Sequence, residues 1–464
     1  MAIPTLTGFA FTRYLLRGAG VTLAETVLFG FGVGTGFLTY EIFLLGLTGV
    51  RFSITGLAAL PVIFALFFFF LLYRSRVRAL PGPVAHIDGR EIKFYISIFL
   101  ALWLAVKIYF VFDENFTRPI HSIDSFLNWS VTAKFFFYRR GLALNPGDEH
   151  FFGAGYRFFL GHPLHYPLVQ MWTSLWLGKF HEVYAKAPSF FYFSGLLGVL
   201  YYAVKRETGA FYAIVTVFFM ASAPIFTYHG IDAYADLPLS FYALAGMVTF
   251  WRFLRTEDRR FLILSGIFLG MGIFVKNEGV FFAAAVFAAL LLFLLLRKKP
   301  VAANLACFLA PLILVSAPWL LFKASHGFGY GHSGHGSGLK WLSDPWYSES
   351  AGRGVHWEVI PKGLKEIFFS ANYNIVFPFW LLLSAAGFKA VIRSELKYLY
   401  MVLFLVIGVF FFVYLTFEAT AVTEVTGIHR NTLTYLPMVF YTAALLLSSL
   451  LRAPPSTEAV SSGE

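Results

Sequence analysis

Runs of roughly 20 apolar residues recur from one end of the sequence to the other, and no other feature limits the fold as strongly. A helix needs about 20 such residues to cross the hydrocarbon core of a bilayer. Hydrophobic residues make up 58% of the 464 residues, more than a water-soluble chain of this length could bury. The sequence therefore predicts an all-α, polytopic membrane protein with about twelve transmembrane helices. They are expected at 27–50, 52–73, 92–112, 187–204, 210–226, 237–254, 261–275, 279–296, 301–322, 374–392, 398–417 and 432–451.

The positive charge of the chain is concentrated in the turns between its apolar runs. The formal net charge of +11 comes mainly from Lys and Arg residues in short turns between these runs, where the positive-inside rule places them in the cytoplasm. We therefore expect contact with membrane lipids and no nucleic-acid partner. The apolar stretch 164–180 is expected to lie in the membrane interface, because counting it as a span would move Lys205 and Arg206 to the outer face.

The alternation of basic turns predicts a single transmembrane domain over residues 1–453, with both chain termini in the cytoplasm. Residues 454–464 are expected to form a disordered cytoplasmic tail. Nearly every unusual polar group falls in or beside the outer loops, whereas the cytoplasmic turns hold mostly Lys and Arg. We therefore expect the functional site on the outer face. The expected outer loops are 113–186, 227–236, 323–372 and 418–430.

The first outer loop contains three acidic residues close to the membrane. Asp113 and Glu114 follow an apolar run directly, and Asp124 precedes a segment with the apolar spacing of an amphipathic surface helix. These acidic residues are therefore candidate catalytic carboxylates. Two plainer interpretations stay open: Asp124 or Ser122 caps the surface helix, and Asp113 and Glu114 are solvated residues at the end of a span.

A second pair of carboxylates, Asp232 and Asp236, lies in a short turn between two apolar runs. Carboxylates this close to hydrocarbon are costly unless they are paired, bind a metal or face a polar cavity. One of them and a carboxylate from the first loop could meet across a cavity. Such a pair could act as a general base or orient an acceptor hydroxyl.

Cationic residues occur at two further outer positions. Lys276 and Glu278 lie between two apolar runs, where they either neutralise each other or present Lys276 to a phosphate. His429 and Arg430 precede the last apolar run. There Arg430 either binds a phosphate through two hydrogen bonds or extends its side chain to the membrane surface. The sequence leaves both pairs of alternatives open.

Two histidines, His162 and His165, raise the question of a metal. Their spacing, with Pro163 between them, does not fit a helical zinc site, and the single cysteine, Cys307, lies inside an apolar run. We therefore expect no required metal or other cofactor. A divalent ion held by carboxylates from several loops stays an open alternative.

Four motifs, taken in order, resemble the GT-C superfamily of integral membrane glycosyltransferases, in particular the protein O-mannosyltransferases and the aminoarabinose transferase of lipid A. They are an acidic residue before a surface helix, a proline-containing run before an interfacial helix, an Ala-Pro pair followed by an aspartate, and a Gly-x-Gly-x-x-x-Lys pattern. In this sequence the four motifs are Asp124 to Gly141, His162 to Leu168, Ala223-Pro224 with Asp236, and Gly270 to Lys276.

The resemblance implies a GT-C fold and an inverting transfer of one sugar from a polyprenyl-phosphate carrier to a hydroxyl of a glycolipid, glycan or protein acceptor. It implies that Asp124 is the base, that Asp236 is the carboxylate of the second loop, and that Lys276 lies near the carrier phosphate. The Asp113-Glu114 pair also resembles the Asp-Glu pair of the mannosyltransferases, so Asp113 is the alternative base.

The same resemblance implies a prokaryotic plasma membrane, with the active site facing outside. His162, His165 and Tyr166 belong to the second motif and are expected to bind substrate or carrier, as are Asp232, Glu278, His429 and Arg430. The Gly- and His-rich segment 325–341 stands where relatives have a mobile outer loop and is expected to form a lid. A transporter or flippase of a lipid-linked saccharide is the alternative class, and it would need no catalytic base.

Overall fold

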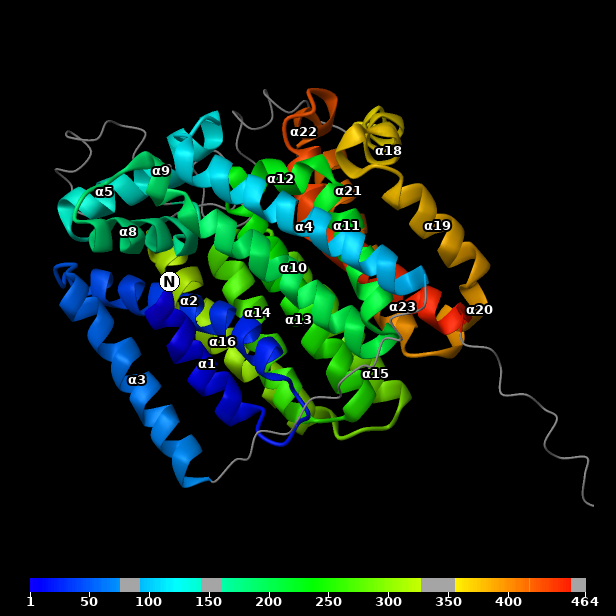
Figure 1. The fold of residues 1–464 in the computed structure, drawn as a ribbon, viewed down its shortest axis with the longest axis horizontal. Helices are drawn as coiled ribbons and strands as arrows, with labels where there is room; N and C mark the ends of the chain where they lie inside the picture. Colours follow the sequence, from blue (N-terminus) through cyan, green and yellow to red (C-terminus); the bar gives the residue numbers. More distant parts are fainter. Residues whose placement is uncertain (76–91, 143–160, 327–354, 417, 452–464) are drawn as a thin grey trace, which may run out of the picture.

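The computed structural model describes residues 1–75, 92–142, 161–326, 355–416 and 418–451 (Figure 1). These residues form helices joined by turns and contain no strand. The tail at 454–464 lies outside the described residues, as does the expected lid from residue 327 onward.

Nine helical segments in the described part of the chain are long and apolar enough to cross a membrane. A tenth span exists if α11 (Ala210–Ser222) and α12 (Pro224–Ile231), which meet at 70°, count as one broken helix. The prediction of an all-α, polytopic membrane protein is thereby confirmed. The nine are α2 (Leu23–Leu47), α3 (Ile54–Arg74), α4 (Ile92–Thr117), α9 (Glu182–Ala185) continued by α10 (Ala187–Thr208), α13 (Asp236–Thr256), α15 (Gly279–Leu296), α16 (Val301–Ser325), α21 (Leu396–Thr416) and α23 (Ile428–Leu451).

The number of spans is lower than the sequence predicts because two expected spans are short. The segment 261–275 lies in α14 (Arg259–Val275), which has 17 residues and is buried along most of its length among other helices. The segment 374–392 is divided into α19 (Val376–Ala386) and α20 (Phe388–Arg393). The break falls at Gly387, which packs so closely on Leu446 that an added Cβ would lie 2.6 Å from its side chain.

Helix α1 (Ala2–Leu15), which packs along α2, was not predicted from the sequence. Three glycines allow the two backbones to touch: a Cβ added to Gly34 would lie 1.6 Å from the carbonyl oxygen of Pro4, and one added to Gly8 would lie 2.0 Å from that of Gly30. Small residues at such positions are the usual way for membrane helices to approach closely. Helix α1 is too short and too interrupted by Thr and Arg to be found by its hydropathy.

The two ends of the helix bundle differ in character. The remaining short helices, with the turn before α13, gather at one end, along the upper part of Figure 1. The basic turns lie at the opposite end, where Arg297 pairs with Glu395 at 2.7 Å and Lys299 with Glu257 at 2.7 Å. The short helices include η1 (Ser125–Ser130), α5 (Val131–Arg139), α8 (His165–Leu177), α18 (Val359–Phe369), η3 (Ala371–Tyr373) and α22 (Ala419–Thr423).

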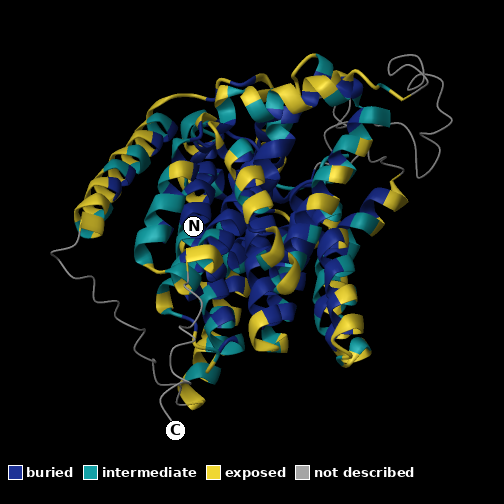
Figure 2. Cartoon of the chain, turned by 90° about the vertical axis from the view of Figure 1, so that its right-hand side faces the viewer, coloured by how far each residue is buried: buried dark blue, intermediate teal, exposed yellow. Residues whose placement is uncertain are grey.

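Figure 2 shows buried residues gathered in the middle of the bundle and exposed residues along its outer helices. Many of the exposed residues on α3 and α4 are large and apolar. Helix α13 is buried along its whole apolar window, whereas α3 and α4 expose most of theirs. In a bilayer such exposed faces are covered by lipid, so they need no protein partner. Helix α13 is therefore the fixed element on which the functional site is built.

Candidate active site

Five of the charged residues that the sequence singled out meet at the end of the bundle that carries the short helices. Asp124 lies at the start of η1, Asp236 is the first residue of α13, and Arg430 is in the first turn of α23. Lys276 and Glu278 lie in the turn between α14 and α15. We call these five residues the charged cluster.

Asp236 is the centre of the charged cluster. Its side chain is fully buried; its Oδ1 accepts a hydrogen bond from Lys276 Nζ at 2.8 Å, and its Oδ2 lies 3.4 Å from Arg430 Nη2. A buried carboxylate with two cationic partners avoids most of the cost of an isolated buried charge. Both oxygen atoms are occupied, so Asp236 fixes the positions of Lys276 and Arg430.

The other two carboxylates approach these cations from outside. Glu278 Oε1 lies 2.9 Å from Lys276 Nζ, and Arg430 Nη1 donates a hydrogen bond to Asp124 Oδ2. The Asp124 side chain is 38% exposed, whereas that of Asp236 is 0% exposed. Asp124 is therefore the carboxylate of the cluster that solvent reaches most easily.

The close approach of two glycines holds Lys276 and Glu278 in place. Gly279 packs on the backbone of Gly272, and a Cβ on Gly279 would lie 2.3 Å from the Gly272 carbonyl carbon. The N–H of Lys276 donates to the Gly272 carbonyl at 3.0 Å, and that of Gly279 donates to the Lys276 carbonyl at 2.9 Å. This tight turn points Lys276 at α13 and gives the Gly-x-Gly-x-x-x-Lys pattern a structural reason.

The charges in this turn shift the pKa values of both ionisable groups. Burial acts to lower the pKa of Lys276, but the carboxylates of Asp236 and Glu278 raise it above the ordinary range. Burial acts to raise the pKa of Glu278, but Lys276 and the hydrogen bonds that Glu278 accepts hold it below the ordinary range. Both groups therefore stay charged at neutral pH.

Asp232 connects the two acidic segments and is not part of the charged cluster. Its Oδ2 accepts a hydrogen bond from the backbone N–H of Ser122 at 2.9 Å, and its Oδ1 accepts one from that of Ala233 at 2.8 Å. His121 Nδ1 lies 3.4 Å from the same Oδ2 atom. Asp232, predicted to bind substrate, thus holds the segment that carries Asp124 against the turn that leads to Asp236.

Side chains from neighbouring helices satisfy the last carbonyl groups around the end of α12. Asn115 Nδ2 donates to the Gly230 carbonyl at 2.9 Å, and Lys186 Nζ donates to the Ile231 carbonyl at 2.8 Å. Ser189 Oγ donates to the Asp232 carbonyl at 2.6 Å, and Tyr166 OH is hydrogen-bonded to Ser189 Oγ. Unsatisfied carbonyl groups at a buried helix end are costly, so these contacts make the turn rigid.

The structure separates Asp124 from the alternative candidates in its loop. Asp124 makes no capping hydrogen bond to η1, so its carboxylate is available to Arg430. Asp113 is exposed near the end of α4, and Glu114 pairs with Arg118 at 2.7 Å. In the described residues, neither Asp113 nor Glu114 forms a contact with the charged cluster.

The histidines expected to bind substrate make contacts with residues outside the charged cluster. His165 is buried, with Nδ1 2.7 Å from Thr39 Oγ1 and Nε2 2.6 Å from Tyr192 OH, and both ring nitrogens are thus occupied. The His162 ring packs against Trp129. His429 lies beside Arg430 in sequence but is hydrogen-bonded at Nδ1 to Tyr373 OH at 2.6 Å. These contacts support the fold around the site.

A group of three or more His, Cys, Asp or Glu residues able to hold a metal ion does not occur among the described residues. Around Asp236, the positions nearest the carboxylate oxygens are taken by Lys276 and Arg430. The charged cluster therefore offers an anionic ligand two nitrogen-based cations.

Three residues in or beside the charged cluster were not predicted from the sequence. The Arg430 guanidinium lies over the Tyr234 ring, with its carbon atom 5.1 Å from the ring centroid. Asn431 Oδ1 lies 3.5 Å from Lys276 Nζ, and Lys323 Nζ donates to Asn277 Oδ1 at 3.0 Å. Their chain positions gave a weak signal: Tyr234 lies between the two aspartates of the turn, and Asn431 follows Arg430.

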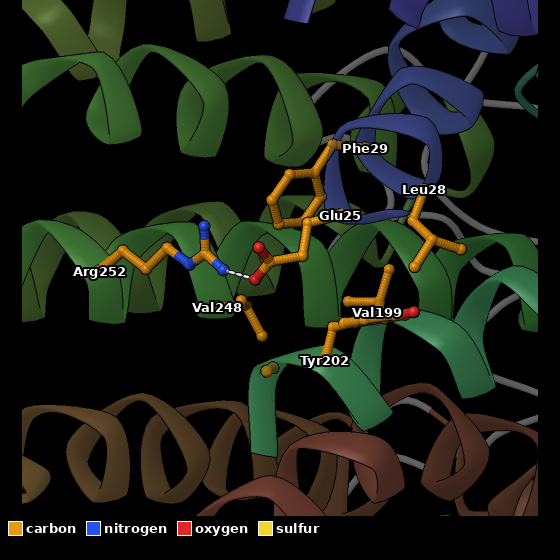
Figure 3. Close-up of a pocket in the computed structure, with 8 residues that line it drawn as sticks. Glu25, Leu28, Phe29, Val199, Tyr202, Val248 and Arg252 are labelled. Carbon is orange, nitrogen blue, oxygen red and sulfur yellow. Dashed lines mark hydrogen bonds and ion pairs between the residues drawn. The ribbon is translucent and has the colours of Figure 1, made fainter. Parts of the chain in front are cut away.

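A small pocket at the basic end of the bundle has a different character (Figure 3). Arg252 and Glu25 point toward each other there and form a buried ion pair, beside apolar residues of α2, α10 and α13. Glu25 also pairs with Arg206 at 2.8 Å and forms a capping box with Thr22 at the start of α2. These contacts join three helix ends, which is a structural role.

The fold and the site together define a polytopic helical membrane protein with a charged site at one end of its bundle. The sequence matches the family described as Dolichyl-phosphate-mannose-protein mannosyltransferase over residues 162–322. This range is about a third of the chain; it includes Asp236, Lys276 and Glu278 but not Asp124 or Arg430. No curated protein matches the chain.

Among solved structures, the chain is similar to ArnT from Cupriavidus metallidurans bound to undecaprenyl phosphate, with a TM-score of 0.52 and 14% identity. The match covers 77% of this chain and 61% of that ArnT chain, so this chain matches about three-fifths of ArnT's length. ArnT from the same organism in the apo state also matches, with a TM-score of 0.41, 15% identity, and coverage of 76% and 77%. The family match and the shared fold confirm the resemblance to GT-C superfamily membrane glycosyltransferases.

Proposed function

We propose that this protein is an inverting glycosyltransferase that moves one sugar from a polyprenyl-phosphate carrier to an acceptor hydroxyl. The observation that carries the proposal is the charged cluster, in which a partly exposed carboxylate, Asp124, lies beside the cations Arg430 and Lys276. One ArnT structure of this fold contains undecaprenyl phosphate, which supports the choice of carrier.

In the proposed reaction, Asp124 takes the proton of the acceptor hydroxyl while the hydroxyl oxygen forms a bond to the anomeric carbon of the sugar. The bond between that carbon and the phosphate oxygen breaks, and its electron pair stays on the phosphate. A base must lie within hydrogen-bond distance of the hydroxyl, which favours the exposed Asp124 over the buried Asp236. Lys276 and Arg430 stabilise the charge that develops on the leaving phosphate.

We further propose that the charged cluster faces the outside of a prokaryotic plasma membrane. The basic turns lie at the other end of the bundle, and the positive-inside rule places such turns in the cytoplasm. The C-terminal end of α23 is proposed to be cytoplasmic, as the sequence predicts for both termini. The prediction is wrong for the N-terminus, because α1 runs antiparallel to α2 with Pro4 against Gly34, which places Met1 part-way along α2 and away from the basic turns. The acceptor is a hydroxyl of a glycolipid, a glycan or a protein.

The proposal is tested by reconstituting the full chain in liposomes with radiolabelled polyprenyl-phosphate sugars and a mixture of envelope acceptors. We expect sugar transfer or slow donor hydrolysis by the wild-type protein, and a loss of about a hundredfold or more in Asp124→Asn with donor binding retained. Asp113→Asn removes an equal charge outside the charged cluster and is expected to stay close to wild type.

Other outcomes identify a different assignment. Loss of transfer in Asp113→Asn alone would move the base to Asp113 and keep the glycosyltransferase. Carrier movement between the two leaflets, without transfer or hydrolysis of any donor, would make the protein a transporter of lipid-linked saccharides.

A further inference from the structure

Arg430 holds two carboxylates that differ in their access to solvent. It contacts buried Asp236 through Nη2 and the more exposed Asp124 through Nη1, and its own side chain is 22% exposed. Releasing Asp124 from this contact costs little, because water can solvate its carboxylate. Releasing Asp236 would leave a buried charge with one cation fewer. Asp124 is therefore the partner that Arg430 can exchange.

Arg430 also has unused hydrogen-bonding capacity. Among the described residues, its buried Nε atom has no hydrogen-bond partner. A guanidinium has five N–H donors in one plane, and the contacts to Asp124 and Asp236 use only two of them. The Tyr234 ring lies beside the guanidinium, with its centroid 5.1 Å from the guanidinium carbon. The arrangement suits a cation that exchanges one acceptor while it keeps its contact to Asp236.

The charges in the cluster favour such an exchange. Asp124, Asp236 and Glu278 contribute three carboxylates, whereas Lys276 and Arg430 contribute two cations. An incoming phosphate finds both cations already paired, so it must compete with a carboxylate for one of them. The reaction then moves a negative charge from the base to the phosphate: Asp124 gains a proton, and the phosphodiester becomes a phosphate monoester with one more negative charge.

We infer that Arg430 exchanges partners during the catalytic cycle. It masks Asp124 in the resting protein, moves to the carrier phosphate when the donor binds, and so leaves Asp124 free to act as a base only in the loaded enzyme. This inference rests on the proposed function and adds an order of events to it: the donor activates the base. In the absence of donor, Asp124 stays paired with Arg430 and does not take a proton from an acceptor hydroxyl.

The test measures binding of undecaprenyl phosphate, the probe, to the full chain in nanodiscs. If Asp124 competes with the phosphate for Arg430, Asp124→Asn binds undecaprenyl phosphate about two- to fivefold more tightly than wild type, although its transfer activity falls. In an Arg430→Gln background, the same Asp124→Asn change should leave the affinity unchanged, because no shared cation remains. Wild type, the two single variants and the double variant form a double-mutant cycle. The cycle isolates the effect of Asp124 on probe affinity that depends on Arg430.

A matched control removes a charge of the same sign without touching Arg430. Glu424 is exposed on the same side of the bundle, just before α23, and Glu424→Gln should leave the affinity close to wild type. An Asp124→Asn protein that binds the probe with equal or lower affinity than wild type overturns the inference and leaves the proposed function standing. Absence of binding in the wild-type protein overturns both. A thermal unfolding scan of each variant verifies that it is folded.

Discussion

The carboxylate of Asp232 accepts a hydrogen bond from the backbone N–H of Ser122 at 2.9 Å, and this bond joins two loops that are 110 residues apart in sequence. Asp124 follows Ser122 by two residues, and Asp236 follows Asp232 by four. The bond therefore helps to set the separation of the two carboxylates that Arg430 bridges. We propose that Asp232 acts as a positioning residue, and its contact with substrate stays a prediction.

The first prediction concerns Asp232→Asn. The amide keeps one acceptor oxygen but places an NH₂ group opposite a backbone N–H, so the segment carrying Asp124 shifts. Because misplacement of a catalytic group by about 1 Å can cost a hundredfold in rate, we expect kcat to fall by about ten- to a hundredfold. Affinity for undecaprenyl phosphate should not fall, because Lys276 and Arg430 are held by Asp236, and it should rise if the shift takes Asp124 away from Arg430.

Ser122→Ala is the control for this prediction. It removes the Ser122 hydroxyl and its contact with Ser125 but keeps the backbone N–H that Asp232 accepts. Steady-state kinetics should therefore show a smaller loss of kcat than in Asp232→Asn. Equal losses in the two variants would indicate that the hydroxyl, and not the Asp232 carboxylate, holds the loop.

The second prediction separates the stabilising role of Lys276 from its catalytic role. Lys276→Met leaves Asp236 and Glu278 without their shared cation, and breaking such a buried pair typically costs about 3–5 kcal/mol of unfolding free energy. Adding Asp236→Asn should restore part of this stability, because the buried charge is removed together with its partner. Transfer activity should stay absent in the double variant. Thermal unfolding and donor turnover, measured on the same samples, give both quantities.

The third prediction uses the pKa of Glu278, which Lys276 and the hydrogen bonds to Glu278 hold below the ordinary range despite burial. A carboxyl group whose pKa is lower in the folded state stabilises the fold above its unfolded pKa of about 4.3, and this contribution is lost as the pH falls toward the folded pKa. At pH values below about 4, the unfolding temperature of the wild-type protein should therefore decrease as the pH is lowered. The decrease should be less steep in Glu278→Gln. Parallel pH profiles for the two proteins would contradict this linkage.

The sequence predicts the spans well because hydropathy alone determines which segments lie in lipid. It fails where packing replaces hydropathy. Helix α14 is short because it is buried among other helices, and α1 is held by backbone contact at Gly8, Gly30 and Gly34 rather than by a long apolar run. Both cases depend on which helices are neighbours, and one sequence does not contain that information.

The members of the charged cluster could be found one by one, because a charge next to hydrocarbon is costly and therefore draws attention. Their partners could not. Asp124 and Arg430 are 306 residues apart, and the sequence offered helix capping and membrane-surface contact as equally good explanations of the two. The structural role of His165 was hidden for the same reason, since its partners Thr39 and Tyr192 lie on two other helices.

The fourth prediction concerns the contact between α1 and α2. An alanine at Gly34 places a Cβ against the Pro4 carbonyl, so the two helices must separate. Overpacking of this kind typically costs about 1–3 kcal/mol, and the unfolding temperature of Gly34→Ala in detergent should fall accordingly. Gly408→Ala is the control, because nothing lies within 4 Å of an added Cβ there. An unchanged unfolding temperature in Gly34→Ala would show that α1 is not held by this contact.

The fifth prediction tests which end of the bundle faces the cytoplasm. The chain has one cysteine, Cys307. A Cys307→Ala background therefore allows a single cysteine to be introduced at any chosen position as a labelling site. Arg118, whose side chain is 69% exposed, lies just beyond α4 at the end with the charged cluster, and Lys299 lies in a basic turn at the other end. In intact cells, a membrane-impermeant maleimide should label Arg118→Cys and not Lys299→Cys, which should react only after the membrane is opened. The reverse pattern would place the charged cluster in the cytoplasm, where a donor on the outer leaflet could not reach Asp124, and would require a carrier presented from the inside.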